Sequence, residues 1–101
     1  MKLNKHESIL AFLARLSSEL EGIAWTVVDH WEGDLHAIGV ARAGEPGVLA
    51  YVSTWRQPPG RYFCSLELPP APGDDAPYRP AGEKEGVGFP EVLRLLREHL
   101  S

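Results

Sequence analysis

The sequence has little cysteine, no long apolar run and no excess of positive charge, and each absence argues against a class of protein. Cys64 is the single cysteine among 101 residues, so an internal disulfide framework is excluded and we expect a reducing, cytoplasmic environment. The chain lacks both an apolar stretch of bilayer-spanning length and a signal-peptide pattern, so we expect no membrane association. The net charge of -4 argues against nucleic acid, because a basic face supplies most of that affinity.

Motifs for metal binding, phosphate binding and catalysis are also missing. The histidines His6, His30, His36 and His99 have no partner at metal-ligand spacing, so we expect no metal and no cofactor. The glycines are scattered through turns and form no phosphate-binding run. Cys64 lies in an apolar strand, where a thiol is usually buried and unreactive. We therefore predict no catalytic residue.

What the sequence does contain is the pattern of one small α+β domain over residues 1–101, with a helix at each end. The hydrophobic fraction of 44% and the charged fraction of 24% are ordinary for a globular domain. Residues 4–21 have apolar side chains at three- and four-residue steps, with Asn4 and Glu7 as a capping box and Gly22 as the stop. Residues 89–100 predict a second helix, with Pro90 in its first turn.

Between the helices, the sequence predicts a four-stranded antiparallel meander. The predicted strands are residues 24–31, 35–42, 48–55 and 61–68, separated by turns rich in glycine and proline. We expect both helices to pack on one face of this sheet. Residues 69–88 are rich in proline and glycine and predict a long loop, either a solvated linker or a binding loop that carries Tyr78 and Arg79.

The predicted turns set a register that sorts the two faces of the sheet. It places Val40 opposite Tyr51 and Tyr51 opposite Leu66, on a face of large apolar side chains. The other face collects small residues such as Ala37 and Ala41. A face of small residues lets another surface approach closely, so we predict a homodimer through it. The alternatives to a homodimer are that this face is exposed to solvent or that residues 69–88 cover it.

The same register brings polar and aromatic groups together at one end of the sheet. Asp29 is predicted to lie opposite His36, His36 opposite Trp55, and Trp55 opposite Tyr62. Such convergence at the open end of a core is typical of small binding pockets. The candidate binding residues are Asp29, Trp31, His36, Trp55 and Tyr62.

These features favour a noncatalytic protein-interaction or binding module with a protein partner. An adaptor, a secretion chaperone or an immunity protein that neutralises a toxin would each fit a small acidic chain in which Trp31, Trp55 and Tyr62 form an aromatic rim. The alternative is a small-molecule-binding protein or minor enzyme whose site lies at Asp29, His36, Trp55 and Tyr62, with residues 69–88 closing over it.

Overall fold

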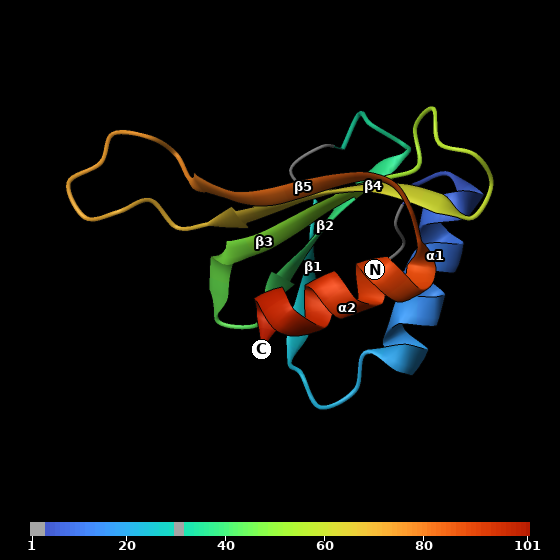
Figure 1. Ribbon diagram of the computed structural model, residues 1–101, viewed down its shortest axis with the longest axis horizontal. Coiled ribbons are helices and arrows are strands. Elements are labelled where there is room, and N and C mark those ends of the chain that lie inside the picture. Colours follow the sequence, from blue (N-terminus) through green and yellow to red (C-terminus); the bar gives the residue numbers. More distant parts are fainter. Residues whose placement is uncertain (1–3, 30–31) are drawn as a thin grey trace.

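The computed structural model describes residues 4–29 and 32–101, and it shows an antiparallel sheet of five strands with two helices (Figure 1). In chain order the elements are α1 (Glu7–Glu19), β1 (Trp25–Val28), β2 (Ala37–Arg42), β3 (Glu45–Ser53), β4 (Arg61–Leu68), β5 (Arg79–Gly88) and α2 (Phe89–Leu100). The strands are hydrogen-bonded in the order β1-β2-β3-β4-β5. The predicted α+β class with an antiparallel sheet is confirmed. Neither helix in the described part of the chain is long and apolar enough to cross a membrane.

The fifth strand corrects the prediction of a loop over residues 69–88. β5 pairs with β4 along its whole length, from Leu68 opposite Arg79 to Arg61 opposite Gly88. Most of its side chains are exposed, so it lacks the alternation of apolar and polar residues by which a half-buried strand is recognised. The pairing also contains two register shifts, which adjust the ladder to its glycine-rich sequence.

Helix α1 starts later than predicted, because His6 rather than Asn4 is the N-cap. The ring Nδ1 of His6 accepts a hydrogen bond from the backbone N–H of Ser8 at 3.1 Å. The predicted capping box of Asn4 and Glu7 is therefore wrong, and Glu7 is the first residue of the helix. Gly22 follows the end of the helix with a φ of 79°, a conformation in which glycine carries no steric cost.

The two helices and the sheet share one hydrophobic core. Helix α1 contributes Ile9, Phe12, Leu13 and Leu16, helix α2 contributes Phe89, Val92, Leu96 and Leu100, and the sheet contributes Ile38, Val40, Val48, Ala50, Val52 and Cys64. Each helix buries positions three, four or seven residues apart, which is the stripe expected for an amphipathic helix. Helix α2 lies across β3, β4 and β5, while α1 stands at one end of the sheet (Figure 1).

Strand β3 is shifted by one residue from the predicted register, and this reverses the direction of its side chains. Val40 lies opposite Ala50 rather than Tyr51, so Ala50 faces the core and Tyr51 faces away from it. The cause is the preceding turn: Arg42 pairs with Glu45 across two residues, and the ladder shifts register after Ala41. The sequence had predicted a longer connection here, between strands 35–42 and 48–55.

The face of the sheet away from the core differs from the predicted surface of small residues. Tyr51 and Phe63 lie on it and pack edge to face, with ring centroids 6.0 Å apart. The Tyr51 hydroxyl donates to Asp34 Oδ2 at 3.4 Å, and burial is the main cause that raises the pKa of Tyr51. Ala37 and Ala41, which were expected to form an open surface, are fully buried.

Residues 69–78 join β4 to β5 and project from one end of the sheet as an arm (Figure 1). The turn at its end is formed through Gly73, whose φ is 79°, and by a hydrogen bond from Asp74 N to Ala71 O at 2.9 Å. At its base, Arg79 Nε donates to Pro69 O at 2.8 Å. These bonds hold the arm in a defined shape although it lies outside the core.

Candidate functional site

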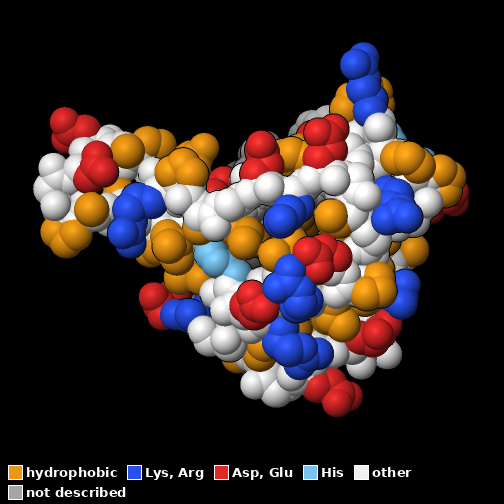
Figure 2. Space-filling view, in the orientation of Figure 1, with side chains coloured by type: hydrophobic (Ala, Val, Ile, Leu, Met, Phe, Trp, Pro, Cys, Tyr) orange, Lys and Arg blue, Asp and Glu red, His pale blue; other side chains and the backbone are white. Residues whose placement is uncertain are grey.

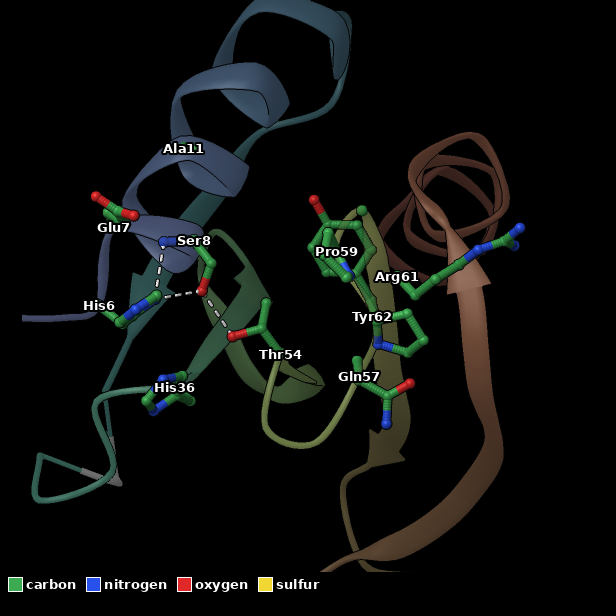
Figure 3. Close-up of a pocket in the computed structure, with 12 residues that line it drawn as sticks. His6, Glu7, Ser8, Ala11, His36, Thr54, Gln57, Pro59, Arg61 and Tyr62 are labelled. Carbon is green, nitrogen blue, oxygen red and sulfur yellow. Dashed lines mark hydrogen bonds between the residues drawn. The ribbon is translucent and has the colours of Figure 1, made fainter.

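A cleft of about 490 Å³ lies at the end of the sheet opposite the arm. One wall is the start of α1, and the other is the loop 54–60 with the first residues of β4 (Figure 3). It is lined by His6, Glu7, Ser8, Ala11, His36, Thr54, Gln57, Pro58, Pro59, Gly60, Arg61 and Tyr62. This volume is within the range of ligand-binding sites in proteins.

Three side chains form a hydrogen-bonded chain that runs from the α1 wall to Thr54 on the opposite wall and is visible in Figure 3. His6 Nδ1 lies 2.8 Å from Ser8 Oγ, and Ser8 Oγ lies 2.7 Å from Thr54 Oγ1. Because the backbone N–H of Ser8 also donates to His6 Nδ1, that nitrogen is an acceptor and the proton of the neutral ring is on Nε2. The chain thus fixes His6 in a tautomer that offers an N–H donor at the cleft wall.

Gln57 supplies a second donor on the opposite wall. Its Oε1 accepts the backbone N–H of Gly86 at 3.0 Å, which ties the loop 54–60 to β5. The NH₂ group of the same amide is then the group through which Gln57 can bind a ligand. With the His6 N–H, it gives the lining of the cleft two side-chain N–H donors, beside the hydroxyls of Ser8 and Thr54.

His36 separates the cleft from a second hollow. Its ring stacks on His6 with centroids 4.4 Å apart, and it meets Trp55 edge to face at 5.3 Å. The second hollow has a volume of about 410 Å³ and is lined by Gly33, Asp34, Leu35, His36 and Trp55. A ligand could therefore contact both hollows across the His36 ring.

Trp55 is the most exposed large apolar side chain in the described part of the chain, at 58%. Its backbone N–H donates to Ser53 Oγ at 3.1 Å. The next residue, Arg56, has a φ of 57°, which is uncommon for a residue other than glycine. Conformations of this kind cost about 1 kcal/mol or more and are concentrated at functional sites. Leu35, in the same hollow, is 43% exposed.

Tyr62 closes the inner side of the cleft. It is half-buried, and its ring packs against Phe12 of α1 and Phe89 of α2 at centroid distances of 5.2 and 6.5 Å. Burial raises the pKa of Tyr62, while the nearby Arg15 acts in the opposite direction. Tyr62 therefore stays protonated at neutral pH and belongs partly to the core.

Asp29 does not pair with His36 as the sequence predicted. Its Oδ1 lies 3.0 Å from Lys5 Nζ, and this lysine also donates to Asp34 O at 2.8 Å. The predicted pairing fails because β1 ends at Val28 and β2 begins at Ala37, which leaves Asp29 and His36 in the connection between the strands. Asp29 thus anchors the segment before α1 and has no place in the cleft.

The structure therefore brings together His36, Trp55 and Tyr62 among the predicted site residues, whereas Trp31 lies outside the described residues. Sequence reasoning missed His6, Ser8, Thr54 and Gln57. A serine two residues after a histidine is the single sequence signal that could have suggested the cap, and it is a weak one.

The other groups that could take part in chemistry lie outside the cleft. Cys64 is fully buried in the core, and burial raises its pKa to about 12, so its thiolate is not available near neutral pH. Among residues 4–29 and 32–101, no group of three or more His, Cys, Asp or Glu side chains could hold a metal ion. Glu91 and Arg94 form an exposed ion pair on α2 at 2.8 Å, and a hydrogen bond from Arg94 lowers the pKa of Glu91.

Comparisons with known proteins give no match for this chain. No family model matches it, and no significant similarity is found to a curated protein or to a solved structure. The function is therefore argued from the geometry of the site.

Proposed function

We propose that this protein is a noncatalytic binding module that recognises a protein partner through the surface around Trp55. The observation that carries the proposal is the position of Trp55, which is 58% exposed and lines the second hollow against His36, the residue that this hollow shares with the cleft. Exposed tryptophans are rare on monomeric surfaces, and they are enriched among the residues that dominate binding energy at interfaces.

The surroundings of Trp55 support this function. Leu35 adds a second exposed apolar group, and Arg56 lies over the Trp55 ring with its guanidinium carbon 5.9 Å from the ring centroid. The strained backbone of Arg56 is the kind of local cost that persists when the surrounding structure requires it. A partner can place an apolar side chain against Leu35 and Trp55 and a polar segment in the cleft.

A small-molecule-binding function is the second candidate, and the volume of the cleft favours it. Ser8 beside His6 has the composition of a nucleophile and base. However, His6 Nδ1 also accepts the backbone N–H of Ser8, so this contact has a structural purpose as a helix cap. This favours binding over catalysis as the use of the cleft.

The sequence-based proposal of a homodimer through the small-residue face of the sheet has weaker support. That face was expected to leave Ala37 and Ala41 open to a second copy, and both are already buried within one chain. The surface around Trp55 is the better supported interface.

A displayed library of random peptides tests the proposal on three immobilised proteins: wild type, Trp55→Ala and Leu10→Ala. Leu10 is the matched control, because it is 43% exposed but lies on α1 and lines neither hollow. We expect peptides that bind wild type and Leu10→Ala and lose at least about tenfold in affinity on Trp55→Ala. Equal binding to all three proteins would contradict the proposal.

A further inference from the structure

We infer that the cleft and the adjoining hollow at Trp55 together bind the arm of a second copy of this chain, so that two copies form a closed dimer. The inference rests on the proposed function in that it uses the same surface, and it specifies the partner. It differs from a dimer through the outer face of the sheet, because the contact lies between residues 69–78 of one copy and the cleft of the other.

The hydrogen-bonding character of the cleft matches the chemistry of the arm. The groups that His6 and Gln57 offer are N–H donors, so a ligand that is rich in acceptors can pair with them. Proline has no N–H and leaves its carbonyl to be satisfied by a partner or by water. The carbonyl of Pro69 already accepts from Arg79, and the arm also contains Pro70, Pro72 and Pro77. Proline-rich segments dock in grooves lined by aromatic side chains such as those of His36, Trp55 and Tyr62.

The arm is also exposed and already ordered. Tyr78 is 43% exposed at its base, and Pro70, Pro72 and Pro77 are exposed along it. Asp74 Oδ1 accepts the backbone N–H of Ala76 at 3.0 Å, which adds to the turn through Gly73. A segment held in one shape before binding loses little conformational entropy when it docks.

The arm of one copy cannot reach its own cleft. The cleft includes Arg61 and Tyr62 at the start of β4, and the arm follows Leu68 at its end, roughly 25 Å away at 3.4 Å per strand residue. Figure 1 shows the arm and the loop 54–60, which forms one wall of the cleft, at opposite ends of the longest axis, along which the chain extends 41 Å. Two copies related by a two-fold axis across this direction place each arm beside the other cleft, so both contacts form and the assembly closes.

Charge complements this arrangement. The end of the arm carries Asp74 and Asp75, and Figure 2 shows acidic side chains at the end of the projecting lobe. Arg56 lies beside Trp55 at the other end of the molecule. The carboxylate of Glu7 lines the same cleft but points away from its opposite wall (Figure 3). A docked arm therefore brings its acidic end towards Arg56, which borders the second hollow beside Trp55.

The test uses two variants that each lose one half of the contact. In the armless variant, residues 69–78 are replaced by Asn-Gly, which suits a two-residue hairpin turn because Leu68 and Arg79 are cross-strand partners. It keeps the cleft, whereas Trp55→Ala keeps the arm. Sedimentation equilibrium of each protein and of their equimolar mixture, up to about 1 mM, detects contacts of millimolar affinity or better. Circular dichroism and urea unfolding of each variant establish that it is folded.

We expect a dimer for the wild type, a monomer for each variant and a heterodimer for the mixture, held by one arm in one cleft. A wild-type chain that is monomeric throughout the series overturns the inference, as does an armless variant that still dimerises or a mixture that stays monomeric. The proposed function is judged separately. If the wild type is monomeric but library peptides still require Trp55, only the inference of a dimer is wrong. If those peptides bind Trp55→Ala as tightly as the wild type, the proposal that the surface around Trp55 is the recognition surface is wrong.

Discussion

His6 and His36 stack with their ring centroids 4.4 Å apart and their planes inclined by 25°, although they lie 30 positions apart in the sequence. This contact joins the start of α1 to the segment before β2. It also connects the helix cap, in which His6 accepts from Ser8, to the recognition surface, in which His36 meets Trp55. Changes at these positions should therefore separate effects on stability from effects on binding.

The cap can be tested with two substitutions of His6. His6→Ala removes the acceptor of the Ser8 N–H, and we expect a loss of about 1 kcal/mol in the free energy of unfolding. His6→Asn restores a good capping side chain but removes the stacked ring, so its stability should lie within about 0.5 kcal/mol of the wild type. Urea unfolding measures both. Equal destabilisation by the two variants would show that the stacked ring, rather than the cap, stabilises this end of α1.

The Lys5–Asp29 ion pair should contribute more than a surface pair. The side chain of Lys5 is 1% exposed and that of Asp29 is 19% exposed, so removing one partner leaves a largely buried charge. We expect Lys5→Met to reduce the free energy of unfolding by about 3 kcal/mol, at the lower end of the range for buried pairs. The double variant Lys5→Met/Asp29→Leu should recover part of that loss. A loss below about 0.5 kcal/mol would mean that the pair is screened like a surface contact.

Burial of Cys64 predicts that the free energy of unfolding decreases at high pH. Burial raises the pKa of its thiol from 9.0 to about 12, so above pH 9 the unfolded chain loses a proton that the folded chain retains. The stability that depends on this difference is complete below pH 9 and is lost as the pH rises towards 12. At pH 10.5 the loss for the wild type should be about 2 kcal/mol greater than for Cys64→Ala, relative to each protein at pH 8. Urea unfolding at the two pH values measures the difference.

The same cysteine can be followed by its reactivity. A disulfide reagent that forms a coloured thiolate should react slowly with the native protein at pH 8 and completely in urea, because Cys64 is 1% exposed. Rapid reaction of the native chain would contradict both the burial of the thiol and its raised pKa.

Trp55 should matter little for stability. Because the side chain is 58% exposed, Trp55→Ala should change the free energy of unfolding by less than about 1 kcal/mol. Phe12→Ala is the contrasting variant, since Phe12 is buried in the core and its truncation should cost about 3–5 kcal/mol. A Trp55 variant that unfolds as readily as the Phe12 variant would place Trp55 in the core and remove the basis for the recognition surface.

The elements that the sequence predicted well are those whose buried side chains form a pattern within a short stretch of sequence. The apolar stripes of α1 and α2 and the Pro90 signal predicted two helices, because a helix buries side chains at fixed local spacing. β5 was missed because its residues are polar, glycine-rich and exposed, and its stabilisation comes from a backbone ladder with β4. Such pairing leaves no periodic pattern in the side chains.

The candidate site was predicted only in part for a related reason. The sequence placed His36, Trp55 and Tyr62 together because each lies at or near a strand end, and the structure keeps them at the same end of the sheet. Asp29 was misplaced because the predicted connection between strands 24–31 and 35–42 was too tight, and the true connection extends from Val28 to Ala37. His6 joins the site through the packing of α1, which no local rule specifies.

The measurement that tests the recognition surface most directly is a titration of the ¹⁵N-labelled chain with a peptide selected on the wild-type protein, followed by amide and indole chemical shifts. The account predicts that the largest changes fall on the Trp55 indole and on the amides of His36, Thr54 and Gln57, around the two hollows. Changes centred instead on Tyr51 and Phe63, on the outer face of the sheet, would contradict it.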